Sequence, residues 1–178
     1  METWNAGAHG NRVWFGDMVM KLYDAAIQGF ARSRIGGWMF VNVFNRVDRV
    51  LMRTTKAKIS TGIGSRFNRD AVLLGCTGAR SGLLREIPLL STPVGHEFVL
   101  IASKAGAPEH PAWYGNLKAN PECTLTVGGR VLRCVAREAE GDERERFWRA
   151  AVDNYAGYAD YQRRTQRRIP VMVLTPAD

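Results

Sequence analysis

A loop at residues 102–114 brings together side chains that are suited to holding a ligand. It follows an apolar run, Phe-Val-Leu-Ile-Ala at 98–102, which predicts a buried strand that ends beside Ser103 and Lys104. At the end of a strand, a hydroxyl and an ammonium group can contact a ligand without breaking the strand. The pattern therefore indicates a binding loop.

The second half of this loop opens a short helix. Pro111 is suited to the first turn of a helix, where its missing N–H costs nothing. Trp113 and Asn116 then lie three residues apart on one helical face, close to the Ser-Lys pair. Taken alone, the segment is explained equally well as an ordinary polar loop with a core tryptophan, since tryptophan is usually a packing residue.

A glycine-rich turn between two strand-like runs carries Arg80 and Arg85. The segment at 76–89 is Cys-Thr-Gly-Ala-Arg-Ser-Gly-Leu-Leu-Arg-Glu-Ile-Pro-Leu. Glycines allow the backbone to approach an anion closely, and guanidinium groups bind phosphates or carboxylates through two parallel hydrogen bonds. The turn therefore indicates an anion site.

Further along, Tyr155, Tyr158 and Tyr161 recur at intervals of three, which fits one helical face of packed tyrosines.

In this order, the three segments resemble the deazaflavin-dependent nitroreductase family over residues 40–176. Each motif alone is weak, but three in order at family-like spacing are specific. The family's turn pattern corresponds to Thr77-Gly78, Ala79-Arg80, Ser81-Gly82, Arg85 and Pro88-Leu89. Its loop and helix patterns correspond to Ser103-Lys104-Ala105-Gly106, Pro111-Ala112-Trp113-Tyr114-Gly115-Asn116-Leu117 and the run Tyr155, Tyr158, Tyr161.

The resemblance implies a split β-barrel that binds the deazaflavin coenzyme F-420. The arginines and backbone N–H groups of the glycine-rich turn, with Lys104, would hold the phosphate and oligoglutamate tail. Ser103 would hydrogen-bond near the deazaflavin ring, and Trp113 and Asn116 would line the groove. The expected cofactor-binding residues are Arg80, Ser81, Arg85, Pro88, Ala102, Ser103, Lys104, Ala112, Trp113 and Asn116.

The same resemblance implies an oxidoreductase that transfers a hydride from the reduced deazaflavin to an electron-poor small molecule: a quinone, an enone or a nitro compound. Tyr158 and Ser103 are the expected catalytic residues, and Tyr155, Tyr158 and Tyr161 the expected substrate-binding residues. A phenol, whose ordinary pKa is about 10, can donate a hydrogen bond to a developing oxyanion at neutral pH.

The chain departs from the family pattern at two positions. Ala79 stands where the family often has a second basic residue, and Ala105 stands where it often has glycine. The missing cation weakens the expected hold on the anionic tail.

Runs of apolar and β-branched residues predict a mainly β fold of the α+β class: a split barrel of six antiparallel strands with flanking helices. Gly128-Gly129 predicts a two-residue hairpin turn. Pro121 ends the short Trp113 helix. Asp142 and Glu145 resemble a capping box before a second helix, one face of which carries Phe147, Trp148, Ala151, Val152 and Tyr155. The expected strands are 71–76, 86–91, 97–102, 123–127, 131–137 and 171–175.

The positive charge is concentrated near the N-terminus. The formal net charge is +8, and residues 1–70 hold 11 Lys or Arg against 5 Asp or Glu. Two amphipathic stripes, at 15–30 and 40–51, are separated by Gly36-Gly37. We therefore expect a helical extension at 1–37 and a split-barrel domain at 38–178. Either stripe can pack on the domain or contact an anionic membrane, and packing is favoured for the second.

Several classes of protein are disfavoured by the sequence. His9, His96 and His110 lack metal-ligand spacing, so no metal is expected. Rossmann and Walker motifs are absent, and the basic residues lack a nucleic-acid-binding motif. The three cysteines read as buried free thiols in a reducing compartment. No secretory signal or membrane-spanning run is present, which predicts a cytoplasmic protein, with contact at the inner face of the cell membrane as one option.

Two alternatives to the deazaflavin reductase remain open. A flavin mononucleotide-dependent reductase on the same barrel would use a related tricyclic ring. A non-catalytic carrier of a cofactor or lipid would keep the groove without turnover.

Overall fold

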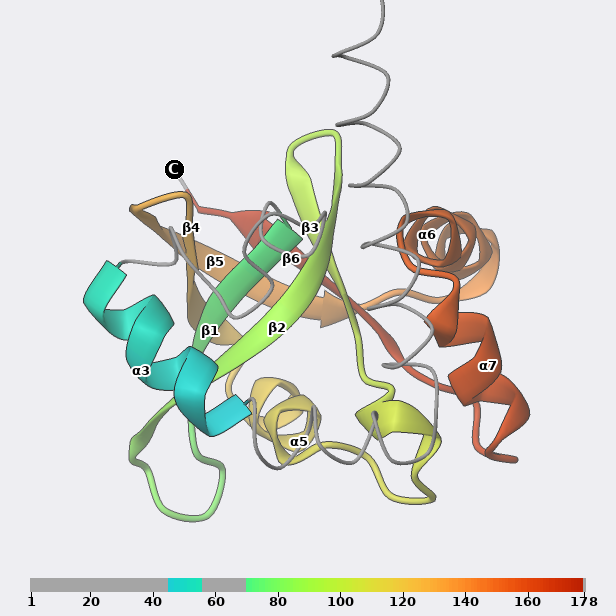
Figure 1. The fold of residues 1–178 in the computed structure, drawn as a ribbon, viewed down its shortest axis with the longest axis horizontal. Coiled ribbons are helices and arrows are strands. Elements are labelled where there is room, and N and C mark those ends of the chain that lie inside the picture. The colour runs from blue at the N-terminus through green and yellow to red at the C-terminus, as the bar shows by residue number, and fades with distance from the viewer. Residues whose placement is uncertain (1–44, 56–69, 178) are drawn as a thin grey trace, which may run out of the picture.

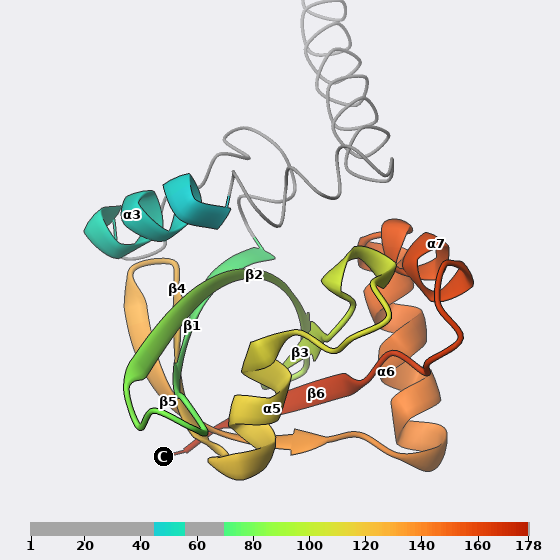
Figure 2. The same cartoon turned by 90° about the horizontal axis from the view of Figure 1, so that it is seen from below.

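Six antiparallel strands close into a barrel. The computed structural model describes residues 45–55 and 70–177. Neighbouring strands pair in the order β1-β2-β3-β6-β5-β4, and β4 returns to β1 (Figure 1, Figure 2). The strands are β1 (Ala71–Thr77), β2 (Leu84–Val94), β3 (Glu97–Ile101), β4 (Glu122–Val127), β5 (Arg130–Glu138) and β6 (Val171–Pro176).

These strands confirm the predicted split-barrel class and the predicted strand positions. The main difference is β2, which is longer than expected because it starts at Leu84 and runs to Val94. The predicted hairpin is also confirmed: Val127 pairs with Arg130, and the two glycines between them have φ values of 56° and 88°. Such positive φ values match the right-handed twist of the flanking strands.

Helices α5, α6 and α7 cover one end and one side of the barrel. Helix α5 (Ala112–Ala119) lies across one end, where it contacts β1 and β5, while α6 (Gly141–Asn154) and α7 (Gly157–Arg163) stand together beside β3 and β6 (Figure 2). A short 3-10 helix, η2 (Lys104–Gly106), connects β3 to α5 and contacts α7. The two ligand-suited segments of the sequence therefore come together at η2 and α7.

Two apolar clusters form the core. The first fills the barrel interior, where Trp113 and Leu117 of α5 close the end. The second lies between the outer face of β3 and β6 and the helices α6 and α7, and it contains all three predicted tyrosines. Phe147 and Ala151 of α6 are fully buried there, as their spacing predicts.

Helix α3 (Asn45–Thr55) packs on the outside of β1 and β2. Its Met52 is buried against Leu73, and Arg53 forms an ion pair with Glu86 at 2.7 Å. The helix thus packs on the domain through Met52, which is not part of the second amphipathic stripe. Of that stripe, Val50 is 65% exposed and Leu51 is only partly buried, so packing of the stripe itself stays a prediction. The first stripe lies outside the described residues, as does the proposed extension at 1–37.

The predicted capping box at Asp142 and Glu145 is wrong. The observed N-cap is Glu140, two residues before Asp142, and it makes no side-chain capping bond, so helix α6 begins at Gly141. Asp142 lies instead in the first turn, where a carboxylate interacts favourably with the helix dipole. Glu145 pairs with Arg144 and Arg168, so its side chain is turned away from the helix start.

Candidate functional site

The loop after β3 has an unusual backbone. Lys104, Ala105 and Gly106 all have positive φ values, of 47°, 53° and 82°. Side chains with a Cβ rarely adopt this left-handed conformation, so the surrounding structure must stabilise it. The result is a tight turn that leaves Ser103 at the end of the strand, as the sequence predicts.

Two buried hydroxyl groups lack a hydrogen-bond partner within the described residues. Ser103 is 9% exposed and Tyr158 is 6% exposed, and neither hydroxyl contacts a donor or acceptor in that part of the chain. Burying an unpaired hydroxyl costs about 1–3 kcal/mol. Unpaired groups of this kind suit a site in which a ligand supplies the missing partner.

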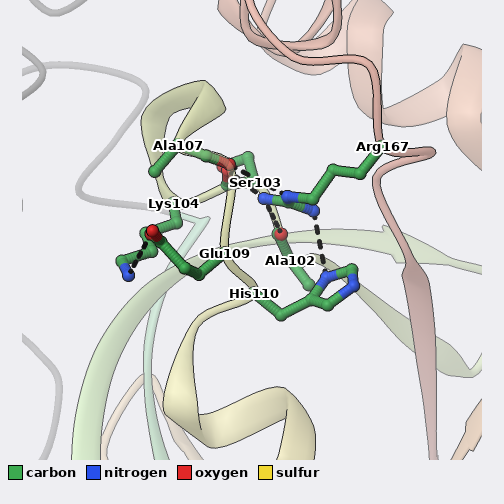
Figure 3. Close-up of polar contacts among 7 residues, drawn as sticks. All are labelled: Ala102, Ser103, Lys104, Ala107, Glu109, His110 and Arg167. Atoms are coloured by element: carbon green, nitrogen blue, oxygen red, sulfur yellow. Dashed lines mark hydrogen bonds and ion pairs between the residues drawn. The ribbon is translucent and has the colours of Figure 1, made fainter.

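Lys104 forms an ion pair with Glu109, with 3.2 Å between Nζ and Oε2 (Figure 3). The ammonium group lowers the pKa of the Glu109 carboxyl. Both side chains are accessible to solvent, so the pair is weak and Lys104 can turn to another anion.

The glycine-rich turn is closed by its own backbone. The Gly78 N–H donates to the Leu83 carbonyl at 2.9 Å, and the Gly82 N–H donates to the Gly78 carbonyl at 2.8 Å. A Cβ at Gly78 would lie 2.7 Å from the Ser81 hydroxyl oxygen, and Gly82 has a φ of 66°. Both glycines are therefore required by the shape of the turn.

The predicted anion-binding side chains project from this turn. Arg85 donates to the Ser81 hydroxyl oxygen at 3.3 Å. Arg80 is exposed and has no partner within the described residues. One cation held by the turn and one that is free to move fit an anion of variable shape, such as a phosphate or a carboxylate tail.

Asn116 holds the turn rather than offering a free amide to a ligand. Its Oδ1 accepts the Ala79 N–H at 3.0 Å, and its Nδ2 donates to the Cys76 sulfur at 3.7 Å. Burial raises the pKa of the Cys76 thiol, so the sulfur is a neutral acceptor. The hydrogen bond between Asn116 and Ala79 could not be predicted from local sequence, because the two residues are 37 positions apart.

The three tyrosines form one cluster across a helix break. Tyr155 is the C-cap of α6, whereas Tyr158 and Tyr161 lie in α7. Their rings meet edge to face at 5.1, 6.0 and 6.3 Å between centroids, and the hydroxyls of Tyr155 and Tyr161 share a hydrogen bond of 3.0 Å. Burial raises the pKa of Tyr158 well above its ordinary value.

The remaining predicted cofactor residues are spread around the barrel end. Trp113 is buried in the barrel core beside Leu117, and Ala102 is fully buried. Pro88 lies in β2 and is partly buried, while Ala112 is exposed at the start of α5. Their contribution to cofactor binding stays a prediction.

Arg167 is a site residue that sequence reasoning missed. It follows α7, and its guanidinium contacts the backbone of the loop that carries Ser103 and Lys104 (Figure 3). Its position in a run of basic residues resembles an ordinary solvated surface, and nothing local identifies a partner 64 residues earlier.

Among the described residues, no group of three or more histidine, cysteine or acidic side chains is arranged to hold a metal ion. None of the helices in this part of the chain has the length and apolar character needed to cross a bilayer.

Comparison with known proteins places this geometry in context. A family model described as F420H(2)-dependent quinone reductase matches residues 42–176. An F420H(2)-dependent quinone reductase of Mycobacterium tuberculosis is 38% identical over 108 residues, which cover 59% of this chain and 72% of the relative. A putative F420H(2)-dependent quinone reductase of the same organism is 37% identical over 117 residues, which cover 65% of this chain and 97% of that relative.

Solved structures show the same barrel. An F420-H2 dependent reductase superposes with a TM-score of 0.57 and 46% identity, over 60% of this chain and 94% of that one. A protein solved as a domain-swapped dimer superposes with a TM-score of 0.59 and 40% identity, over 72% of this chain and 96% of that one.

Gly157 tests how tightly the tyrosine cluster is packed. A Cβ at this position would overlap the ring of Tyr155, so Gly157→Ala must displace the ring and its bond to Tyr161. We expect a loss of about 1–3 kcal/mol in unfolding free energy, measured by chemical denaturation. The control is Gly115→Ala in α5, where a Cβ meets no atom within 4 Å and alanine favours the helix. Equal stability of the two variants would contradict the packing described here.

Proposed function

Because the chain belongs to the F420H(2)-dependent quinone reductase family, we propose that it transfers a hydride from reduced coenzyme F-420 to a quinone. The family is one of oxidoreductases, and its cofactor is coenzyme F-420. The observation that carries the proposal is the pair of buried hydroxyls, Ser103 and Tyr158, that have no partner within the described residues.

The residues present fit this cofactor at its anionic end. In the turn at 78–82, a Cβ at Gly82 would meet no atom within 4 Å, so the space beside the backbone is open to an anion there. The N–H groups of Arg80 and Ser81 make no hydrogen bond within the described residues. With the guanidinium groups of Arg80 and Arg85, these N–H groups would hold the phosphate and the oligoglutamate tail. Lys104 would add a third positive charge.

The residues also fit at the ring end. When bound, the reduced deazaflavin supplies the hydride, and the protein supplies position and electrostatics. The Ser103 hydroxyl would hydrogen-bond near the ring, which satisfies one of the two unpaired groups. Tyr155, Tyr158 and Tyr161 would form an aromatic wall against which a planar quinone can stack.

Tyr158 acts in this proposal as a hydrogen-bond donor rather than as a proton-transfer acid. Burial raises the pKa of its phenol, so the proton stays on Tyr158 throughout the neutral range. A donor aimed at the quinone oxygen stabilises the negative charge that develops there as the hydride arrives. The final proton of the hydroquinone then comes from solvent.

Two alternatives are separated by direct measurement. A flavin mononucleotide enzyme would bind that cofactor tightly and coenzyme F-420 poorly. A carrier would bind coenzyme F-420 but show no turnover with any acceptor.

Enones and nitro compounds belong to the same electron-poor class, and we propose them as secondary substrates.

The anion site is tested by Arg85→Ala. Loss of a charge-assisted hydrogen bond should weaken binding of coenzyme F-420 by about 1–3 kcal/mol, measured by fluorescence titration at low salt, with flavin mononucleotide titrated in parallel. The control, Arg133→Ala, removes an exposed arginine from β5 and should leave affinity unchanged. Unchanged affinity in Arg85→Ala would contradict the anion site, and tight flavin binding alone would contradict the cofactor.

The catalytic role is tested by Tyr158→Phe in a screen of quinones, enones and nitroaromatics with reduced coenzyme F-420. Removing only the hydroxyl should lower turnover on the order of 10²-fold, because one oxyanion donor is lost. Cofactor affinity and melting temperature should change little, since the ring remains.

In the wild type, turnover should show no loss from tyrosine ionisation up to about pH 10, because the pKa of Tyr158 is raised.

Two further substitutions control for Tyr158. Tyr155→Phe and Tyr161→Phe each remove one hydroxyl from the bonded pair. If either of these loses turnover while Tyr158→Phe keeps it, the donor is that neighbour. If all three keep full turnover, the cluster is only a packed core.

We also propose peripheral contact with an anionic membrane, where a lipophilic quinone would dissolve. The support is the excess of basic residues in 1–70. In liposome flotation, we expect the full chain to bind anionic but not neutral vesicles, and a chain lacking residues 1–37 to lose binding. Equal behaviour of the two chains would contradict this contact.

A further inference from the structure

The Ser103 loop must be stabilised from outside, because its backbone is unfavourable on its own. Two residues with a Cβ, Lys104 and Ala105, have positive φ values. Only two internal backbone bonds support the turn: the Gly106 N–H donates to the Ser103 carbonyl, and the Ala107 N–H donates to the Lys104 carbonyl, both at 3.0 Å. The carbonyls of Ala102 and Ala107 accept neither of these bonds and need other donors.

One guanidinium supplies these donors. Arg167 donates from Nε to the Ala107 carbonyl at 2.9 Å and from one terminal nitrogen to the Ser103 and Ala102 carbonyls at 2.8 and 3.2 Å. Its other terminal nitrogen lies 3.0 Å from Nδ1 of His110 (Figure 3). All three nitrogens of the fork are used, and together they span the loop from the end of β3 almost to α5.

The backbone around Arg167 is itself fixed. Gln162 donates to the Arg167 carbonyl at 2.9 Å and accepts the Ile169 N–H at 2.9 Å. The buried Arg144 donates to the Ile169 carbonyl at 3.1 Å. The segment between α7 and β6 is therefore held at Arg167 and at Ile169, which fixes the backbone from which the guanidinium projects.

The loop is also docked directly on α7. A Cβ at Gly106 would lie 2.7 Å from the Tyr161 carbonyl oxygen and 2.9 Å from Cβ of Arg164. This close approach joins the loop to the helix that carries Tyr158 and Tyr161. Arg167 follows that helix, so it connects the Ser103 side of the site to the tyrosine side.

We propose that Arg167 is a positioning residue, which fixes Ser103 and Lys104 relative to the tyrosine helix and so sets the geometry of the cofactor site. This inference rests on the proposed function. A planar fork with fixed donor directions is required for the task, because a lysine offers one point charge and cannot reach four acceptors at once.

The pKa of His110 gives a measure of the Arg167 contact that needs no cofactor. Because Arg167 can only donate, Nδ1 of His110 must accept, which makes the ring neutral with its proton on Nε2. Burial lowers the pKa of His110, the positive charge of Arg167 lowers it further, and Glu138 opposes both. Loss of the guanidinium should therefore raise the pKa of His110.

The test compares Arg167→Gln and Arg167→Lys with Arg168→Gln. The control removes the neighbouring arginine, which pairs with Glu145 and makes no contact with the loop among the described residues. Two measurements need no cofactor: the titration of His110 by NMR, and amide hydrogen exchange at Gly106 and Ala107. Two more use the deazaflavin: its dissociation constant and the turnover with a quinone.

For Arg167→Gln, we expect the pKa of His110 to rise, exchange at both amides to accelerate at least about tenfold, and coenzyme F-420 affinity to fall by a similar factor. Turnover should fall on the order of 10²-fold, since a small misplacement of catalytic groups is costly. Arg167→Lys should keep the low pKa of His110 but not the slow exchange or the affinity. Arg168→Gln should match the wild type.

Two results would overturn the proposal. Wild-type exchange and affinity in Arg167→Gln would show that the loop holds itself. Full recovery of affinity in Arg167→Lys would show that charge alone matters, and not the fork. A wild type that binds no deazaflavin would instead overturn the proposed function, and the exchange and titration data would still show whether Arg167 holds the loop.

Discussion

The hydrogen-bonded pairing of β6 with both β3 and β5 is the constraint on which the rest of the molecule depends. Residues 171–174 of β6 are all buried, and they separate the barrel core from the tyrosine cluster. The ladder with β3 continues to Ala102, whose N–H donates to the Pro170 carbonyl at 3.0 Å. Ser103 and the segment that follows α7 therefore leave the same pair of strands, side by side.

The parts of the fold with local signals were predictable, and the parts built from distant contacts were not. Six strands, the Gly128-Gly129 hairpin and the buried face of α6 follow from periodicity and turn chemistry. The capping box failed because spacing alone cannot say where Glu145 points. Asn116 and Arg167 bond to backbone groups far away in sequence, where an amide or a guanidinium looks like any surface residue.

The candidate site combines rigid support with unpaired groups. The backbone around Ser103 is tied by Arg167 and by the contact of Gly106 with α7, yet the Ser103 hydroxyl has no partner in the described chain. The same is true of Tyr158 within the bonded tyrosine cluster. Support of this kind lets a protein keep costly polar groups in place for a ligand, and the stability that they forgo is recovered when the ligand binds.

The strand order also determines when the site can exist during synthesis. Because β6 fits between β3 and β5, a nascent chain that has reached only α7 can form just an open sheet, β3-β2-β1-β4-β5, with unpaired edges at β3 and β5. The register partner of Val173 on β3 is Val99, which leaves the ribosome long before it. Barrel closure is thus a late, long-range step, and chains waiting for it expose apolar edges that invite association with other chains.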